Sequence, residues 1–581
     1  MKTRSLGQYL LFITILLVLG IFLLWPIGLT LEGGFIDSQT KQLTFKHISL
    51  VFQDPTLRTG ILNATFIAVS TTLLCLVLSL PLAILTARCD FPFKKTFSAL
   101  ILVPLILPPF VGAIGVRQLL GRYGAFNSLF NTHIDFLGSA KFWGVVLVEA
   151  LHLYPILYLN ATAALANLDP TLDEAAENLG IPARKRFFKI TLPLIRPGLF
   201  AGGTIVFIWS FTELGTPLMF DLYEVTPVQV FNRIKEMEGS SVPYALTAVM
   251  LAFAVLFYVL GKLVFGGHAY AMYGKASIAA RTRKLNLTNR IIASAAFGFV
   301  IFLAVLPHIG VIITSFTANG EWYRSILPTN WTTQHYADAL RHKLAVGSIA
   351  NSLKYACIAM IVTSVVGVTV GYLIVRTKIV GRGFLDALTM LPLAVPGLVM
   401  AFGYVALTLT FPFNLTEQNA TTGWLWFLPI AKQFDILGPM ANPLILLVVA
   451  YSIRRLPYMV RSVVAGLEQT SIELEESARN LGAGPFKTLR KITLPLITAN
   501  LIAGGLLVFA FSMLEVSDSL ILAQREIDFP ITKAIYTFFE RLGDGQYIAS
   551  AMGVWGMALL TVTLVGASIL LGKKMGALFR I

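Results

Sequence analysis

Four charged side chains stand in stretches that are otherwise apolar: Glu213, Arg454, Arg455 and Glu515. An ionisable side chain inside a membrane span is costly and faces a partner or a water-filled cavity, so each one marks a candidate path for a solute. Two roles are open for the glutamates: an acidic constriction that contacts or repels the solute, or hydrogen bonding to neighbouring helix ends that holds a gate together. Two roles are also open for the arginines, which either line a cavity for an anion or extend their charged heads to the membrane surface.

A second kind of chemistry, the docking of another protein, is indicated by two polar segments that lie 302 residues apart. The first reads DEAAENLG over residues 173–180, the second reads EESARNLG over residues 475–482, and each leads into the sequence ITLPLI. Asp169 before Pro170 predicts an N-cap with proline at the first helical position, and residues 470–473 predict a capping box. Each segment is therefore expected to form a short helix of about three turns that ends in a left-handed glycine.

Small residues in these two helices would let another protein's surface approach closely, with a carboxylate at the same edge of each helix. The residues that we expect to make this contact are Glu174, Ala175, Ala176 and Gly180 in the first segment, and Glu476, Ser477, Ala478 and Gly482 in the second. A capped helix at a membrane surface also has a purely structural interpretation. Two copies in corresponding positions favour docking.

The composition places the elements that carry these residues in a membrane. The chain has 581 residues, of which 56% are hydrophobic and 13% are charged, which is too little polar surface for a soluble protein of this size. An apolar helix needs about 20 residues to cross the hydrocarbon core. About twelve such windows are centred near residues 20, 73, 108, 153, 208, 254, 302, 362, 397, 452, 510 and 560. We predict an all-α integral membrane protein with about twelve transmembrane helices, the first of them a retained anchor.

The net charge of +15 does not indicate nucleic-acid binding, because the basic residues sit in short loops between apolar windows. Lys and Arg are more numerous in the alternate segments that include both chain ends and both repeated polar segments. Cytoplasmic loops carry such an excess. Both termini and both polar segments are therefore expected in the cytoplasm, and membrane lipid is expected around the spans.

The two halves of the chain correspond well beyond the polar segments. Asn63, Arg88 and Pro108 recur 288 positions later, and Pro155 and Glu213 recur 302 positions later, which implies a net insertion of 14 residues in the second half. Each half holds six windows, so the two repeats are expected to cross the membrane in the same sense. Parallel repeats of this kind place the solute pathway between them.

The predicted units are a first membrane half at residues 1–275, a cytoplasmic linker at 276–288 and a second membrane half at 289–581. Matching prolines such as Pro108 and Pro396 predict kinked spans around a cavity. Glu149 has no acidic counterpart in the second half. We interpret it as structural, paired with His152 or with a neighbouring span.

The two polar segments resemble the EAA loop of binding-protein-dependent ABC importer permeases, and the chain resembles two fused copies of their MetI-like fold. The loop pattern is Glu-Ala-Ala, a glycine four positions after the second alanine, and then Ile-x-Leu-Pro; the second copy has Glu-Ser-Ala instead. The resemblance implies a cytoplasmic ABC ATPase dimer that holds both segments, an extracytoplasmic solute-binding protein, and alternating access of a pore in the bacterial inner membrane. ATP and Mg²⁺ are expected on the separate ATPase, because this chain lacks the phosphate-binding sequence G-x-x-x-x-G-K-[ST].

In general appearance the chain is most similar to ferric iron importer permeases, with thiamine and aminoethylphosphonate importers as alternatives. A rival function is a secondary transporter of twelve spans driven by an ion gradient, which would not need docking segments. An enzyme is not indicated, because the sequence offers no paired carboxylates, nucleophile with its base, or metal-spaced His and Cys cluster outside structural contexts. We therefore predict no catalytic residue, bound cofactor or resident metal in this chain.

Overall fold

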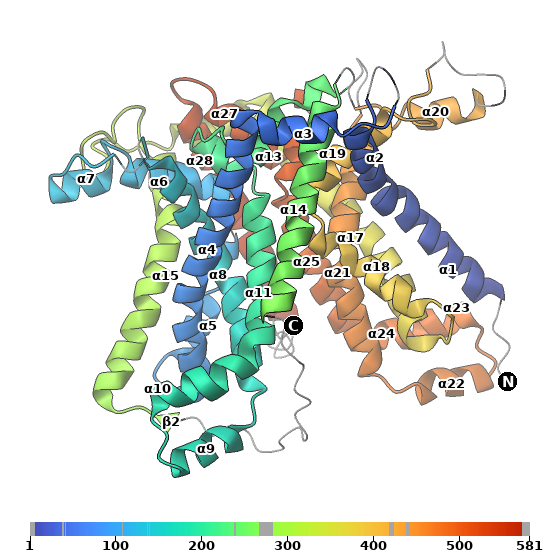
Figure 1. Ribbon diagram of the computed structural model, residues 1–581, viewed down its shortest axis with the longest axis horizontal. Coiled ribbons are helices and arrows are strands. Elements are labelled where there is room, and N and C mark those ends of the chain that lie inside the picture. Colours follow the sequence, from blue (N-terminus) through green and yellow to red (C-terminus); the bar gives the residue numbers. More distant parts are fainter. Residues whose placement is uncertain are drawn as a thin grey trace.

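The computed structural model is built almost entirely from helices, most of which run between two ends of the molecule (Figure 1). It describes residues 6–571, except 38–39, 41, 107, 136, 139, 238–239, 266–282, 417–422, 424 and 437–441. More than half of the predicted linker at 276–288 therefore lies outside the described residues. Two short strands pair in parallel: β1 (Cys89–Asp90) in the first half and β2 (Arg283–Lys284) in the described part of this linker.

The helices follow the same order in the two halves of the chain. The first half contains α1 (Leu6–Leu19), α2 (Trp25–Phe35), α3 (Lys46–Gln53), α4 (Pro55–Arg88), α5 (Lys94–Leu100), α6 (Pro109–Leu120), α7 (Ala125–Phe130), α8 (Lys141–Ala166), α9 (Pro170–Asn178), α10 (Ala183–Arg186), α11 (Leu192–Phe211), α12 (Gly215–Met219), α13 (Thr226–Asn232) and α14 (Val242–Phe265). The second half contains α15 (Leu287–Ser315), α16 (Gln334–Arg341), α17 (Lys343–Arg376), α18 (Arg382–Ala394), α19 (Gly397–Thr408), α20 (Leu428–Ala431), α21 (Leu444–Glu468), α22 (Glu473–Asn480), α23 (Pro485–Thr488), α24 (Leu494–Leu496), α25 (Thr498–Met513), α26 (Ser517–Leu522), α27 (Ile531–Phe539) and α28 (Gly545–Leu571).

The predicted membrane windows coincide with long helices. Within the described residues, 7 single helices are long and apolar enough to cross a membrane, and the number rises to 10 when each of 3 bent helix pairs counts as one span. The remaining two windows coincide with α21 and α28. Three arginines, Arg454, Arg455 and Arg461, make α21 less apolar than the other spans. The prediction of an all-α membrane protein built from two repeats is confirmed.

Side-chain caps fix where the two longest spans begin. The Asp54 carboxylate accepts hydrogen bonds from the N–H groups of Thr56 (2.8 Å) and Leu57 (3.2 Å) at the start of α4. At the start of α17, the N–H of Leu344 donates to Nδ1 of His342 over 3.3 Å. These caps satisfy donors that the first helical turn leaves open. Each helix then continues for 34 residues, or about 50 Å at 1.5 Å per residue.

The matched prolines break one span in each half, as predicted. The chain turns by 103° between α18 and α19, where Pro396 precedes α19. In the first half the corresponding turn is 95°, and Pro108 precedes α6. Proline lacks the N–H that would continue the helix, and it disfavours helical geometry in the preceding residue. By contrast, α8 and α21 continue through Pro155 and Pro457.

The first span of each sequence half packs against the other half. In Figure 1, α1 lies beside α18 of the second half and α15 lies beside α4 of the first half, and close approaches at two glycines accompany this exchange. A Cβ atom on Gly115 would lie 2.2 Å from the carbonyl oxygen of Pro307, and one on Gly403 would lie 2.6 Å from that of Pro26. The two glycines are 288 positions apart. The same helix crossing is therefore repeated, and the predicted boundaries at 1–275 and 289–581 remain divisions of the sequence.

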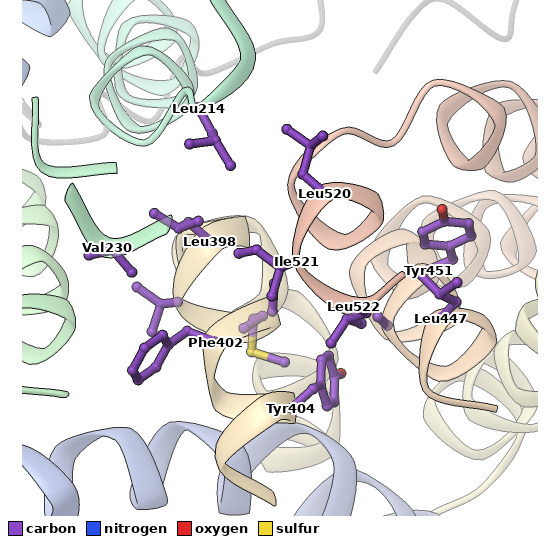
Figure 2. Close-up of a cluster of buried hydrophobic side chains, with 14 of the residues drawn as sticks. Leu214, Val230, Leu398, Phe402, Tyr404, Leu447, Tyr451, Leu520, Ile521 and Leu522 are labelled. Carbon is purple, nitrogen blue, oxygen red and sulfur yellow. The ribbon is translucent and has the colours of Figure 1, made fainter. Parts of the chain in front are cut away.

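Buried apolar side chains from both halves form one cluster between them (Figure 2). Leu214 and Val230 come from the first half, and Leu398, Phe402 and Ile521 come from the second. Leu214 directly follows Glu213 in the sequence. The packed contact between the halves therefore lies next to one of the charged residues that were singled out from the sequence.

Candidate functional site

A cavity of about 130 Å³ lies between the two halves, and all four predicted pathway residues line it. Arg454 and Arg455 reach it from α21, Glu213 from the break between α11 and α12, and Glu515 from the break between α25 and α26. The backbone N–H of Glu213 donates to the carbonyl of Ser210, and that of Glu515 donates to the carbonyl of Ser512, both over 3.3 Å. The two glutamates therefore occupy equivalent turns on opposite walls of one cavity.

Hydroxyl and backbone groups hold the acids of the first half. Glu213 accepts hydrogen bonds from the backbone N–H (3.3 Å) and the hydroxyl (3.4 Å) of Thr216, at the start of α12. Glu149 also lines the cavity, and its Oε2 accepts a hydrogen bond from the Ser210 hydroxyl of α11. Its Oε1 is buried without a hydrogen-bond partner in the described structure. The predicted pairing with a neighbouring span is thus found through Ser210, and the Nδ1 of His152 lies 2.8 Å from the carbonyl oxygen of Pro104.

Guanidinium groups hold the acids of the second half. Glu515 accepts hydrogen bonds from both Arg454 and Arg455, and Arg454 also donates to Asp518 over 3.1 Å. Arg455 donates to the backbone carbonyl of Phe511 over 3.2 Å, and its guanidinium carbon lies 5.3 Å from the centre of the Phe511 ring. Glu515, Arg455 and Asp518 are buried. Both arginines therefore turn into the protein, and the interpretation that they extend to the membrane surface does not describe them.

The sequence pattern did not single out Asp518 or Tyr458, which complete this wall. Asp518 stands at the position of Thr216, 302 residues earlier, so no acidic pair revealed it. Tyr458 lines the cavity beside Arg454 and Arg455. Asp518 lies in the first turn of α26, three residues after Glu515, and a second acid so close to a predicted pathway residue is the available sequence signal.

The repeated polar segments form the short helices α9 and α22, at the same end of the molecule (Figure 1). The N–H of Ile181 donates to the carbonyl of Ala176, and the N–H of Ala483 donates to that of Ala478, each over 3.0 Å. Between them, Gly180 has a φ of 72° and Gly482 a φ of 83°. These bonds define the same left-handed cap in both copies, so the predicted glycine ends are confirmed.

The starts of α9 and α22 differ. The Asp169 carboxylate accepts from the hydroxyl (2.7 Å) and the N–H (2.9 Å) of Thr171, which lower the pKa of the carboxyl below its usual value. The capping box predicted at residues 470–473 is wrong, because α22 begins at Glu473 and the described structure shows no side-chain cap there. The Thr470 hydroxyl instead accepts a hydrogen bond from Arg376 over 2.9 Å. The side chain that would have capped the helix is therefore engaged elsewhere.

The predicted docking residues divide into outward and inward groups. Glu174, Ala175 and Gly180 of the first copy, and Ser477 and Gly482 of the second, are exposed. Ala176 is buried, whereas Glu476 and Ala478 are half-buried. The most exposed apolar side chains in these segments are Leu179 (79%) and Leu481 (88%). Those two leucines precede the cap glycines, and reasoning from small residues and carboxylates did not select them.

No group of three or more His, Cys, Asp or Glu side chains within the described part of the chain is arranged to hold a metal ion. The geometry instead offers two kinds of site: a charged cavity between two repeated halves, and two short exposed helices at one end of the molecule. Their residues come from equivalent positions in both halves. This combination suits a solute pathway together with a docking surface.

The comparisons with known proteins agree with a duplicated permease. The family model described as "Binding-protein-dependent transport system inner membrane component" matches residues 79–270 and again residues 363–571. The ferric transport system permease protein of Actinobacillus pleuropneumoniae is 25% identical over 93% of this chain and 75% of its own length. An Fe(3+)-transport system permease protein of Haemophilus influenzae is 23% identical over 91% of this chain and 92% of its own.

A smaller relative matches only part of the chain. The molybdenum transport system permease protein of Escherichia coli is 28% identical over 33% of this chain, which corresponds to 89% of its own length. A protein of that size therefore corresponds to one repeat. The chain belongs to the family of binding-protein-dependent transport system inner membrane components, and it carries two copies of the family's domain in one polypeptide.

Proposed function

We propose that this chain forms the pathway by which an ATP-driven importer carries ferric iron across a bacterial inner membrane. As a permease of a binding-protein-dependent ABC importer, it works with an ATPase and a solute-binding protein and is not itself an enzyme. The observation that carries the choice of substrate is the similarity to ferric permeases over more than nine-tenths of the chain.

The chemistry of the cavity supports a cationic solute. Four carboxyl side chains line it or bind its lining residues, namely Glu149, Glu213, Glu515 and Asp518, against the two guanidinium groups of Arg454 and Arg455. The arginines are occupied by the acids of their own wall. Hard cations bind oxygen ligands, and the first-half wall presents carboxylate oxygens with hydroxyl partners. Glu213 and Glu149 are therefore the residues most suited to contact the solute.

The position of α9 and α22 supports docking on the ATPase. Both helices lie at one end of the molecule (Figure 1), with Leu179 and Leu481 exposed beside their cap glycines. Exposed apolar side chains in matched positions mark a surface for a partner. Under this proposal that end and both termini face the cytoplasm, and an ATPase dimer that binds ATP and Mg²⁺ holds one helix in each subunit.

The proposal can be tested by purifying the chain from native membranes in mild detergent and identifying the proteins that accompany it. The complex is then reconstituted in liposomes with its binding protein and assayed for uptake of ferric iron, thiamine and aminoethylphosphonate. We expect an ATPase in two copies, an iron-loaded binding protein, and ferric uptake that needs ATP on the side of α9 and α22. Uptake of another solute alone would overturn the choice of iron.

The secondary-transporter alternative predicts a different result in the same liposomes. Uptake would then follow an imposed proton gradient and would proceed without the ATPase. A matched control is the same chain with Gly180 and Gly482 both changed to valine, which strains both cap glycines and leaves the cavity residues unchanged. Normal ATP-driven uptake by that variant would contradict the assignment of α9 and α22 as docking helices.

A further inference from the structure

The two longest helices, α4 and α17, are held at both ends by polar side chains that recur in the two halves. At the end of α4 nearest α9, Arg88 donates to the carboxylate of Asp173 in α9 over 3.2 Å and to the hydroxyl of Thr191 over 2.9 Å. Thr191 ends the turn of π-helix that leads into α11. One guanidinium therefore joins the span α4 to both arms of the docking segment.

The same connection is found at the equivalent end of α17. Arg376 donates to the carboxylate of Glu475 in α22 over 3.0 Å, and also to the carbonyl oxygens of Leu467 and Thr470, both over 3.0 Å. The side chains of Arg376 and Glu475 are only 7% and 3% exposed, whereas those of Arg88 and Asp173 are 35% and 28% exposed. The second connection is therefore more buried and more extensively bonded.

The opposite ends of both helices are held by a matched pair of asparagines. The side-chain amide of Asn63 in α4 donates to the carbonyl of Glu224 over 2.7 Å, and that of Asn351 in α17 donates to the carbonyl of Ile527 over the same distance. Glu224 lies in the loop after α12, and Ile527 lies in a short 3-10 helix (Glu526–Asp528) after α26. Those two short helices begin directly after the cavity glutamates, Glu213 and Glu515.

We propose that α4 and α17 act as rods that transmit movement of the docking helices to the segments that carry the cavity glutamates. Arg88 and Arg376 are positioning residues at one end of each rod, and Asn63 and Asn351 are positioning residues at the other. The inference rests on the proposed function as an ATP-driven importer but not on the identity of the solute. A displacement of α9 or α22 by the ATPase would be carried along the rod to the wall of the cavity.

The dimensions of the helices suit this role. Each arginine follows its asparagine by 25 residues, which corresponds to about 37 Å along a helix. The backbone hydrogen bonds of a helix make it a rigid connection between ends that are too far apart to touch. Pro81 interrupts that bonding within α4, whereas α17 has no proline between its two polar ends. The rod of the second half is therefore expected to be the stiffer one.

The test measures the number of solute molecules imported per ATP hydrolysed by the reconstituted complex with its ATPase and binding protein. Arg376→Gln and Asn351→Ala are made singly and together in α17. The matched control is Thr369→Ala in the same helix, at a half-buried position whose hydroxyl donates to the carbonyl of Val365 in α17 itself. We expect each single change to lower import per ATP by about tenfold, the scale at which residues along such networks alter coupling. The ATPase should still copurify, because the exposed surface of α22 is unchanged.

The double variant separates transmission from a merely structural role. The free-energy effects of changes at two distant, independent sites add. If the two changes act independently, the double variant should therefore lower import per ATP by the product of the two single fold-losses. A rod released at one end transmits nothing further when the other end is also released, so the double variant should import as well as the worse single variant. Multiplied losses, or normal import per ATP in both single variants, would overturn the proposal.

The same measurements on α4 keep the proposal testable if the buried Arg376 variant does not fold. Arg88→Gln and Asn63→Ala remove half-buried connections, and Arg88→Lys, which keeps the charge near Asp173, should recover part of the import. A failure of the proposed function has a separate sign: the unmodified complex would then show no ATP-driven uptake at all. If the unmodified complex is active and every α4 variant imports normally, the proposal that α4 transmits movement is contradicted, while the proposed function as an importer stands.

Discussion

The two halves build the same turn around a glutamate but surround it with different chemistry. In the first half, Glu213 is held by the backbone and hydroxyl of Thr216, whereas in the second half Glu515 is held by Arg454 and Arg455. At an offset of 302, the two arginines stand where the first half has His152 and Leu153, Asp518 stands at the position of Thr216, and Tyr451 stands at that of Glu149.

The two halves therefore share a backbone turn at the cavity but differ in the side chains that bind its glutamate. The second-half wall pairs two acids with two guanidinium groups, so its charges balance. The first-half wall instead holds the carboxylates of Glu149 and Glu213 through neutral hydroxyl and backbone donors, so their charges have no guanidinium partner among the described contacts. We therefore propose that the second wall fixes α21 against the break between α25 and α26, and that the first wall contacts the solute.

The largest expected contrast is in stability. Glu515→Gln leaves the buried Arg455 without its carboxylate partner and Arg454 with Asp518 alone, and it should cost about 3–5 kcal/mol because an uncompensated charge remains inside the protein. At the equivalent position, Glu213→Gln weakens only hydrogen bonds from the neutral donors of Thr216, so it should cost about 1 kcal/mol of unfolding free energy. Thermal unfolding in detergent measures both.

A second substitution checks the cause of that contrast. Arg455→Leu places the first-half residue in the second half and, added to Glu515→Gln, should recover part of the lost unfolding temperature by removing an uncompensated charge. Equal destabilisation by Glu213→Gln and Glu515→Gln would show that the ion pairs do not distinguish the two walls.

The docking segments should respond alike in the two halves. Gly180 and Gly482 both have positive φ, and among the described atoms nothing lies within 4 Å of a Cβ built on either. Valine at each position should therefore cost backbone strain alone, about 1–2 kcal/mol. The check is the fraction of ATPase that copurifies with each single variant and the import per ATP that remains. A large difference between Gly180→Val and Gly482→Val would mean that the two docking helices are not equivalent.

The features that could be predicted from the sequence are those that depend on local sequence and recur in both halves. Hydrophobic windows, matched prolines and matched polar segments predicted the membrane helices, the broken spans and the glycine caps, because each depends on local sequence. The capping box at residues 470–473 failed because a tertiary contact from Arg376 took the Thr470 hydroxyl that local sequence had assigned to the cap. A local sequence pattern does not show which distant side chain will bind to the residues of that pattern in the folded protein.

The pathway residues show the same limit. Apolar surroundings identified Glu213, Glu515, Arg454 and Arg455, but the pairing of both arginines with one glutamate depends on how α21 packs beside α25. Glu149 was interpreted as structural because its repeat position holds no acid. The exchange of the first spans was equally hidden, since the crossing at Gly115 depends on a contact with Gly310 almost 200 residues away.

A smaller effect, on import alone, should follow from Glu149→Gln. The amide oxygen of glutamine can still accept the hydrogen bond from Ser210, so the fold should be retained. Loss of the carboxylate from the first-half wall should lower iron import by about tenfold, which corresponds to about 1.4 kcal/mol. The matched control is Tyr451→Phe at the equivalent second-half position, which should lower import less. Normal iron import by Glu149→Gln would return this residue to a structural role and weaken the assignment of the first wall.

The smallest effect concerns the start of α9, which has a side-chain cap that α22 lacks in the described structure. Because the hydroxyl and N–H of Thr171 lower the pKa of Asp169, the cap is complete above the ordinary carboxyl pKa and is lost as the pH falls through the lowered value. Hydrogen exchange at the N–H of Thr171 should therefore accelerate in acid, after correction for intrinsic exchange. Asp169→Asn keeps a neutral acceptor at the same place and should remove that pH dependence while retaining protection. An unchanged pH dependence in Asp169→Asn would assign the effect to another group.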